Sequence, residues 1–496
     1  MILYNLINSS LHLLQKFKNI ALLFFLSILI IIAAYGNINN PNFWFDESGQ
    51  IWMSCGLNHF SPINSNFGSY NDILKSNNSH NLDPGGFTFL LAILLKVTTI
   101  PILIRFIPFL FFLLTLYIVY LIIKKELNEK FIQILMPFLL LLSSLISQYA
   151  FELRAYSFEM CITLCCLLFV LESQIIISST KKSLLMGLLL SVGVTSRYSA
   201  IFPIFSCLLL FFIYIICDYS KLKIFNFILI LLPFLITLIL IYIFVFRYQN
   251  PTGSPPSYVG DLMLNRNNLQ NIFFHPKSIF LLAPLLFLTF RNRYRVRNKL
   301  FYSKYLHFTY TLLALLLFAS SIGKYPILFR TRFDIGIHSV LICAWFFVFI
   351  IFYKKIYSKI RFNKLIQFLI LYIFCIIVAM NVKYIPNDST YDLLKNCLNS
   401  NGKILANQGS LPTVKYLFEL GPLKSKINIY QNIYFYSEYY KPDLLELKRD
   451  KVKLDEFKYY LFSFYNKNDS IYKLISKSDE YVLCKTSGPS QLFIKK

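Results

Sequence analysis

The stretch Ile224–Phe246, IFNFILILLPFLITLILIYIFVF, holds no charged residue and is almost wholly apolar. A helix of about 18 to 25 such residues is long enough to cross ~30 Å of hydrocarbon. Similar runs recur along the 496-residue chain, among them Ile20–Ala34 and Phe131–Leu142. Soluble proteins do not concentrate apolar residues in repeated runs of this length. The sequence therefore predicts a polytopic α-helical membrane protein.

The apolar-length criterion predicts about eleven transmembrane helices. The run 278–290 is short, and the runs 183–196 and 199–216 are separated only by Ser196-Arg197-Tyr198. Residues 86–99 are apolar but too short to span, so we expect an interfacial or re-entrant helix there. The predicted spans are 19–36, 102–123, 131–148, 157–173, 183–196, 199–216, 224–246, 278–290, 305–322, 335–353 and 364–381.

The charged residues of the loops predict how these spans are oriented across the membrane. If residues 1–18 are cytoplasmic, the loops 291–304 and 354–363 are cytoplasmic too, and they carry basic residues and no acid. The first outer loop, 37–86, carries one basic residue and four acidic ones. This asymmetry follows the positive-inside rule, which also accounts for much of the net charge of +25 without a nucleic-acid partner. We expect a plasma (bacterial inner) membrane protein with a cytoplasmic N-terminus.

The composition changes after the last predicted span. Residues 1–381 are predicted to form the membrane domain, and residues 382–496 a small extracytoplasmic α/β domain. Cys397 and Cys484 lie in this tail and would be able to pair in an oxidising compartment. The predicted strands are Lys403–Ala406, Ile427–Tyr430, Tyr459–Phe464, Tyr481–Cys484 and Leu492–Ile494, with a helix at Thr413–Leu420.

Asp46 and Glu47 form a carboxylate pair in the first outer loop, directly after the aromatic residues Phe43, Trp44 and Phe45. An acidic pair in a loop is most simply a solvated feature. Aromatic side chains would hold this pair at the membrane interface, where desolvation raises the basicity of a carboxylate. Asp46 is therefore a candidate general base.

Several basic residues are predicted on the outer side, against the positive-inside trend. Guanidinium groups suit bidentate phosphate binding, so these residues are candidates for a lipid-phosphate site, although ordinary interfacial residues would have the same pattern. Asp83, in the turn Asp83-Pro84-Gly85-Gly86, would cap the helix that follows. The candidates for phosphate or substrate binding are Arg154, Tyr156, Arg197, Lys324, Arg330, Arg332 and Asp83.

Five segments follow one another along the chain: Asp46-Glu47, the turn near residue 84, Ile104–Pro108, Glu152–Ser157 and Arg332-Phe333. Taken in this order, they resemble the polyprenyl-phosphate-dependent glycosyltransferases of the GT-C fold. The resemblance is to the branch with protein O-mannosyltransferases and the bacterial aminoarabinose transferase of lipid A. It covers roughly residues 20–355, and no single motif is specific without the others. This chain has Asp83-Pro84-Gly85 where the family has a His-Pro-Pro-like turn, and Arg332-Phe333 where it has Arg-Tyr.

The resemblance implies a GT-C-like membrane domain and inverting sugar transfer from a polyprenyl phosphate to an extracytoplasmic lipid, glycan or protein. Asp46 would take the acceptor proton, and Glu47 would orient Asp46 or the acceptor. Arg154, Arg330 or Arg332 would neutralise the phosphate leaving group. No cofactor is implied, and the scattered histidines have no zinc-like spacing, although a divalent metal is not excluded.

Two other functions fit part of the pattern. A transporter or flippase of lipid-linked sugars would also be polytopic, but such proteins tend to have repeated halves and ionisable residues near the bilayer midplane. No repeat is visible, and the charges lie at the outer edge. A non-catalytic assembly protein that binds through its tail would not require Asp46.

Overall fold

The computed structural model of the chain forms two compact units, which we name the helical unit and the sheet unit. Among the described residues, the helical unit contains 83–86 and 108–357. The sheet unit contains the described residues of 43–80, 87–107 and 390–496. The structure describes residues 43–57, 67–80, 83–249, 273–294, 299–323, 325–327, 329, 331–357, 390–397, 402–423, 433–437, 446–448, 453–463, 469–487 and 490–496.

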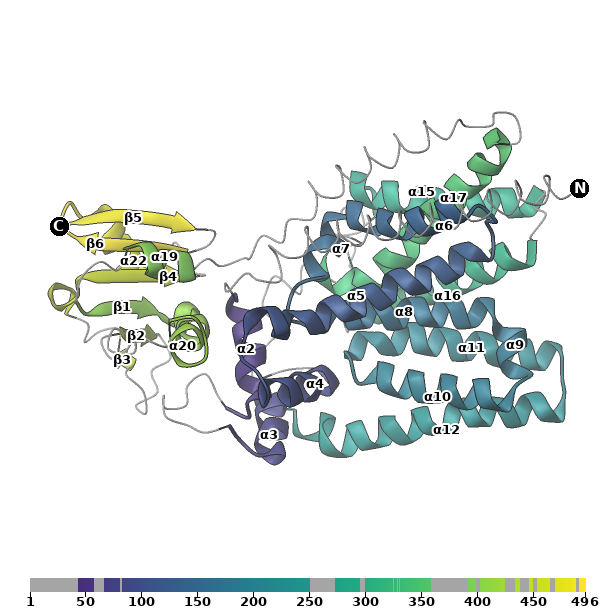
Figure 1. Cartoon of the computed structure of the whole chain (residues 1–496), viewed down its shortest axis with the longest axis horizontal. Coiled ribbons are helices and arrows are strands. Elements are labelled where there is room, and N and C mark those ends of the chain that lie inside the picture. The colour runs from purple at the N-terminus through teal and green to yellow at the C-terminus, as the bar shows by residue number, and fades with distance from the viewer. Residues whose placement is uncertain are drawn as a thin grey trace, which may run out of the picture. The chain divides into compact units, whose positions relative to one another are not determined.

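The helical unit is organised around α8 (Tyr156–Leu171), which packs against α10 (Thr180–Val194), α11 (Ile201–Cys217), α16 (Lys299–Ser321) and α17 (Ile335–Tyr357) (Figure 1). Almost every residue of α8 is buried, as expected of a helix that is apolar all round and lies within a bundle. The other helices described in this unit are most of α5 (Pro101–Lys124), α6 (Lys130–Leu135), η1 (Met136–Leu142), α7 (Ser144–Tyr149), α9 (Ser173–Ile177), η2 (Tyr198–Ala200), α12 (Lys221–Phe244), η3 (Phe246–Tyr248), α15 (Pro276–Tyr294) and η4 (Arg332–Asp334).

Four stretches among the described residues are long and apolar enough to cross a membrane, and each overlaps a predicted span. The predicted break at Ser196-Arg197-Tyr198 is confirmed, because α10 ends at Val194 and η2 begins at Tyr198. The total of eleven spans remains a prediction, and the spans 19–36 and 364–381 lie outside the described residues. The four stretches are Pro101–Lys124, Tyr198–Cys217, Lys221–Tyr248 and Arg332–Lys355.

The predicted span at 131–148 differs from the structure, which has three short helices there. The chain runs through α6, then the 3₁₀ helix η1, then α7. Pro137 lies near the start of η1 and lacks the N–H that an α-helix would use. Ser143 then leaves the helical conformation and its Oγ accepts a hydrogen bond from Ile146 N at 3.4 Å, which starts α7. The local chemistry of these two residues overrides the apolar pattern.

The sheet unit contains a six-stranded sheet in the order β3-β2-β1-β4-β6-β5. The four strands from β3 to β4 are parallel, and β5 and β6 form an antiparallel hairpin at one edge (Figure 1). Leu405, Tyr460 and Phe493 pack with Ile471 and Ile475 to form its core. The elements are α19 (Thr390–Cys397), β1 (Ile404–Asn407), η5 (Gln408–Ser410), α20 (Leu411–Glu419), β2 (Ile433–Ser437), β3 (Glu446–Lys448), η8 (Leu454–Glu456), β4 (Tyr459–Ser463), α22 (Ser470–Lys477), β5 (Tyr481–Ser487) and β6 (Ser490–Lys495).

The predicted α/β character of the tail is confirmed. Four of the five predicted strands correspond to β1, β4, β5 and β6, and the predicted helix corresponds to α20. The strand predicted at Ile427–Tyr430 and the predicted domain boundary after residue 381 lie outside the described residues. A disulfide joins Cys397 at the end of α19 to Cys484 in β5, the pairing that the sequence left open.

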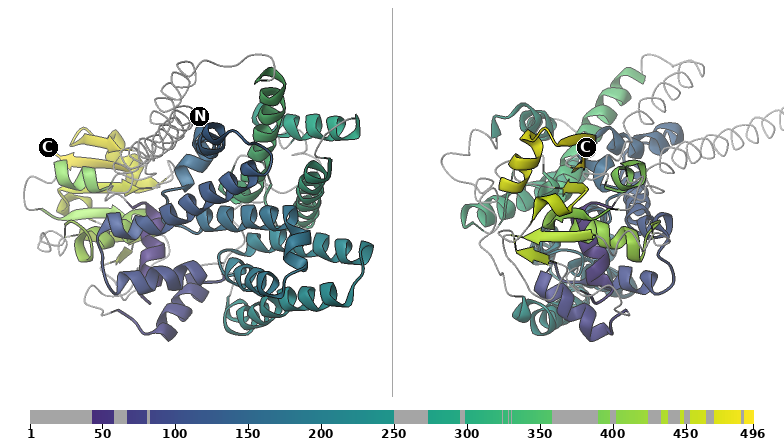
Figure 2. Two further views of the ribbon diagram at one scale, coloured as in Figure 1. Left: turned by 45° about the vertical axis from the view of Figure 1, so that its right-hand side comes forward. Right: turned by 90° about the vertical axis from the view of Figure 1, so that its left-hand side faces the viewer.

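The sheet shares its unit with helices from the N-terminal part of the chain. These are α2 (Phe45–Ser54), α3 (Tyr70–His80), α4 (Gly86–Leu95) from Phe87 onward, and the first turns of α5. Figure 2 shows these purple and blue helices from two further sides, together with the green and yellow sheet. The helix Gly86–Leu95 confirms a short helix within residues 86–99, and its position at the membrane interface remains a prediction. The carboxylate pair therefore belongs to the same compact unit as the C-terminal sheet.

Candidate functional site

Asp46 and Glu47 lie in the first turn of α2, where carboxylates stabilise the positive end of a helix. Glu47 is completely buried, whereas Asp46 is half-buried. The two oxygens of Glu47 accept hydrogen bonds from Arg105 Nη1 at 2.7 Å and Nη2 at 3.1 Å. Glu47 Oε2 also accepts from the backbone N of Trp44 at 3.2 Å. Of the two carboxylates, Asp46 is therefore the one that a substrate can reach.

Arg105 is a residue whose role the sequence did not show. Its guanidinium is fully buried against Glu47 and lies 4.3 Å from the centre of the Phe43 ring. A buried and bidentate ion pair of this kind fixes the geometry of both partners. Together Glu47 and Arg105 hold the start of α2, and so the backbone of Asp46.

The helix α2 also contacts α20, which follows strand β1 of the C-terminal sheet. The indole Nε1 of Trp52 donates to the carbonyl oxygen of Pro412 at 3.1 Å. Ser48 Oγ, one residue after Glu47, donates to Thr413 Oγ1 at 3.4 Å. Both contacts join residues more than three hundred positions apart in the sequence. The helix with the carboxylate pair is therefore held by the C-terminal domain.

The contact between α2 and α20 excludes water. Lys415 is only 1% exposed, lies 4.6 Å from the Trp52 ring and approaches Glu419 to 4.0 Å. Burial lowers the pKa of Lys415. Burial, with the Glu419 charge, raises the pKa of the nearby Cys55 thiol to about 12. Cys55 is thus an inert thiol that reports on this contact.

The turn Asp83-Pro84-Gly85-Gly86 belongs to the helical unit and requires its glycines. Gly85 has φ of 93°, a conformation that favours glycine. The N–H of Gly86 donates to Thr195 O at 2.9 Å, and a Cβ on Gly86 would lie 2.1 Å from Thr195 Oγ1. The turn therefore packs directly on the segment that precedes Arg197, and this brings Asp83 beside that arginine.

Arg197 is the centre of a charged cluster in the helical unit. Its Nη1 contacts Glu159 Oε2 at 2.6 Å, and its Nε lies 3.6 Å from Asp83 Oδ1. The guanidinium also lies 4.5 Å from the centre of the Tyr156 ring. A cation against an aromatic face and two carboxylates is held in a fixed orientation. This arrangement joins three of the predicted residues, Asp83, Tyr156 and Arg197.

Arg154 and Arg332 complete this cluster, which we name the Arg197 cluster. The charges of Arg197, Arg154 and Arg332 act on the Tyr156 hydroxyl, against the single opposing charge of Glu152. Glu152 is fully buried, whereas Arg154 and Arg332 are half-buried. Asp83 is half-buried too, but it is paired with Arg197. Guanidinium groups therefore outnumber carboxylates among the accessible charges of the cluster, which suits an anion with several oxygens.

The backbone before Arg332 is firmly held. Phe329 has φ of 60°, a rare conformation for a residue other than glycine. Its carbonyl oxygen accepts a hydrogen bond from His338 Nδ1 at 3.0 Å, and His338 Nε2 lies 2.8 Å from Ser143 Oγ. Thr331 and Asp334 then cap η4, with Thr331 Oγ1 donating to Asp334 Oδ2 at 2.8 Å. These contacts fix the backbone from which the Arg332 side chain extends.

The predicted site residues thus fall into two groups. Asp46 and Glu47 belong to the sheet unit, and Asp83, Arg154, Tyr156, Arg197 and Arg332 meet in the helical unit. Lys324 and Arg330 lie outside the described residues. Glu159 was missed, although a carboxylate within an apolar run is a recognised sign of a functional or paired group. Within the part of the chain that the structure describes, no group of three potential metal ligands is found.

No known family model matches the sequence, and no curated protein matches it. The structure gives the class: the fold is that of the GT-C membrane proteins. The solved structures that it resembles include ArnT from Cupriavidus metallidurans in the apo state, with a TM-score of 0.52 and 11% sequence identity. This match covers 95% of this chain and 97% of that one. ArnT bound to undecaprenyl phosphate matches with a TM-score of 0.50 and 10% identity over the same shares of both chains.

Proposed function

We propose that the chain is a membrane glycosyltransferase that uses a sugar linked to a polyprenyl phosphate. The observation that carries this proposal is the ArnT fold, shared over 95% of the chain with a structure bound to undecaprenyl phosphate. The Arg197 cluster supports it from within the chain, because its accessible side chains suit a lipid phosphate. The acceptor would be an extracytoplasmic lipid, glycan or protein.

In the proposed reaction the acceptor attacks C1 of the sugar from the face opposite the phosphate. Asp46 takes the proton of the attacking hydroxyl or amine, and the bond between C1 and the phosphate oxygen breaks. The electron pair of that bond leaves with the polyprenyl phosphate, and the configuration at C1 is inverted. Preorganised cations that meet this developing charge supply a large part of such catalysis. We assign that task to Arg154 and Arg332, together with Lys324 and Arg330.

The remaining site residues have supporting roles in this scheme. Glu47 and Arg105 hold α2, so that Asp46 has a fixed position. Asp83 and Glu159 orient Arg197, which in turn contacts Tyr156. Such partners keep catalytic groups within the narrow range of geometry that transfer needs.

The substitution Asp46→Asn tests the proposed base. It keeps the size of the side chain and removes its basicity, so transfer is expected to fall by about 10²–10⁴-fold. The measurement follows labelled hexose, pentose or aminopentose from polyprenyl phosphate into envelope material, in membranes that contain equal amounts of each variant. Asp72→Asn is the matched control, because Asp72 is an exposed carboxylate of the same loop whose pKa is lowered by its hydrogen bonds to Ser69.

Full transfer by the Asp46→Asn variant would remove Asp46 from the mechanism and leave the rest of the proposal standing. A transporter or flippase gives a different result: labelled donor crosses the membrane in liposomes, and no sugar is transferred by the wild-type chain. If neither movement nor transfer occurs with any donor, the chain is an assembly protein and not an enzyme.

A further inference from the structure

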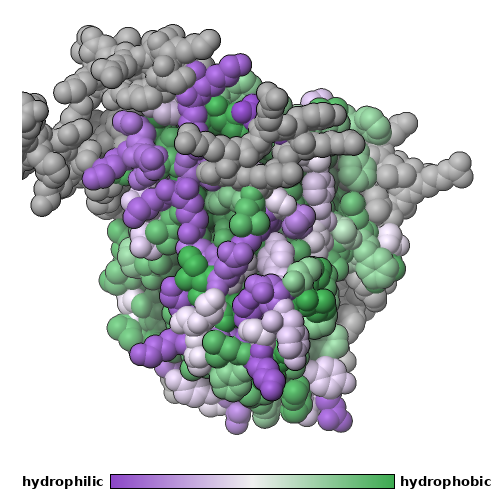
Figure 3. All heavy atoms as spheres, turned by 90° about the vertical axis from the view of Figure 1, so that its right-hand side faces the viewer, coloured by the Kyte–Doolittle hydropathy of each residue, from purple (hydrophilic) through white to green (hydrophobic). Residues whose placement is uncertain are grey.

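A second charged site lies at the far end of α8 from the Arg197 cluster. With 16 residues in α8 and a rise of about 1.5 Å per residue, its two ends are about 24 Å apart. At the end near Leu171, the helical unit presents a band of hydrophilic side chains flanked by apolar ones (Figure 3). This end contains the loops predicted to be cytoplasmic. The site is therefore separate from the Arg197 cluster.

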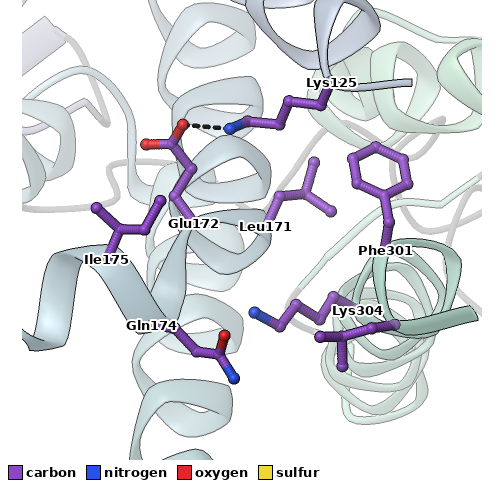
Figure 4. Close-up of a pocket in the computed structure, with 8 residues that line it drawn as sticks. Lys125, Leu171, Glu172, Gln174, Ile175, Phe301 and Lys304 are labelled. Carbon is purple, nitrogen blue, oxygen red and sulfur yellow. Dashed lines mark ion pairs between the residues drawn. The ribbon is translucent and has the colours of Figure 1, made fainter. Parts of the chain in front are cut away.

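The site is a pocket between the ends of α5, α8 and α9 and the start of α16 (Figure 4). Its polar lining consists of Lys125, Glu172, Gln174 and Lys304. Lys125 Nζ and Glu172 Oε1 form an ion pair at 2.5 Å. The Lys304 and Gln174 side chains point toward one another on the other side of the pocket (Figure 4).

The charge of Lys304 is not balanced within the described residues. Lys304 is only 6% exposed, and its Nζ donates to the neutral Ser173 Oγ at 2.9 Å. No ion pair of Lys304 is found in the described part of the chain, and the charge that acts on it is the like charge of Lys125. Glu172, the carboxylate of the pocket, is already engaged by Lys125.

Two other acids at this end, Glu126 and Asp218, have partners of their own. Glu126 contacts Lys354 at 3.3 Å, and Asp218 contacts Lys223. A lysine at a membrane edge ordinarily extends its ammonium into water, which makes a partner unnecessary. Lys304 does not, and a buried charge without an opposite charge is costly. An anion in the pocket would remove that cost.

The rim of the pocket favours an anion that is attached to a lipid. Ile175 and Leu300 line the pocket and are 51% and 60% exposed, and apolar residues exposed on a membrane protein face acyl chains. The Gln174 amide next to Lys304 can donate to a second oxygen of the same anion. We propose that this pocket binds the phosphate group of a membrane lipid, with Lys304 as its charge partner and Gln174 as a second donor.

The test uses the full-length protein in detergent and three probes: dihexanoyl phosphatidic acid, dihexanoylglycerol and inorganic phosphate. Native mass spectrometry reports the affinity of each probe. Phosphatidic acid is expected to bind the wild type, and Lys304→Gln to weaken it about tenfold, since a charge-assisted hydrogen bond contributes roughly that much. Lys221→Gln is the control, because Lys221 is an exposed lysine at the start of α12 and does not line the pocket.

A second variant that binds more tightly distinguishes a specific effect from loss of the fold, because an unfolded protein would not gain affinity. Glu172→Gln removes the competing carboxylate and releases Lys125, so it is expected to tighten phosphatidic acid binding several-fold. Unchanged affinity in both pocket variants would overturn the proposal. Equal binding of dihexanoylglycerol would show that the phosphate is not recognised. Inorganic phosphate that binds as tightly as phosphatidic acid would show a free-anion site, and the assignment to a lipid would then be wrong.

Discussion

The Glu47–Arg105 pair and the Arg197 cluster use the same chemistry, a guanidinium against carboxylates, but differ in access to solvent. Glu47 and Arg105 are both 0% exposed, and their charges match one to one. In the Arg197 cluster the acids Glu152 and Glu159 are buried. The guanidinium groups of Arg154 and Arg332, in contrast, are partly accessible.

This difference separates a structural ion pair from a surface that can bind a ligand. The buried Glu47–Arg105 pair has no oxygen or nitrogen that a ligand can contact. It can therefore affect activity only by changing the position of Asp46. In the open cluster Glu159 and Asp83 hold Arg197, while Arg154 and Arg332 remain partly accessible. Accessibility, and not residue type, therefore distinguishes the two regions, and substitutions in each should affect different properties.

The largest expected effect is the loss of stability in Arg105→Met. It leaves the Glu47 carboxylate buried without its partner, which is expected to cost about 3–5 kcal/mol. The double variant Arg105→Met with Glu47→Gln removes the orphaned charge and should recover part of that loss. The midpoint of urea unfolding, followed by circular dichroism in detergent, measures both. The interpretation of Glu47 and Arg105 as a structural ion pair is wrong if Arg105→Met lowers the free energy of unfolding by less than about 1 kcal/mol, the ordinary cost of a point substitution.

The second prediction concerns activity at unchanged stability. Arg154→Gln should lower sugar transfer by about 10²-fold, because a cation that meets the leaving phosphate is lost. Its melting temperature should stay within about 2 °C of the wild type, as expected for a partly exposed residue. Arg154→Lys should restore only part of the rate, since an ammonium cannot bind two phosphate oxygens in a fork.

Arg247→Gln is the matched control for the Arg154 variants. Arg247 is an exposed arginine in η3 of the same helical unit, and it should keep full transfer activity. If Arg247→Gln and Arg154→Gln lower transfer equally, the effect comes from general surface charge and not from the Arg197 cluster.

The two regions also show which features of the structure could be predicted from the sequence. Four apolar stretches, the break at Arg197 and four strands of the tail follow from local composition, and the structure confirms them. The strands β2 and β3 were not predicted. The partners of the charged residues do not follow from it, because Glu47 meets Arg105 58 positions away and Ser48 meets Thr413 365 positions away. Such pairings depend on the packing of whole elements. Pro137 and Ser143 were visible in the sequence, but the apolar count at 131–148 concealed their effect.

The smallest expected effect is that of Tyr416→Phe in α20. The Tyr416 ring packs edge-on against Phe43 with ring centres 4.8 Å apart. Its hydroxyl is buried and makes no hydrogen bond within the described part of the chain. Tyr416→Phe keeps the ring contact and removes a desolvated polar group, so stability should change by less than about 0.5 kcal/mol. Tyr416→Ala removes the ring and should cost about 3–5 kcal/mol.

Cys55 gives a local readout of this contact at pH 8. Its thiol, with a pKa raised to about 12, should resist iodoacetamide in the wild type and in Tyr416→Phe, whereas Tyr416→Ala should expose it. Rapid labelling of Cys55 in the wild type would show that α20 does not cover α2, and the C-terminal domain would then have no part in holding Asp46.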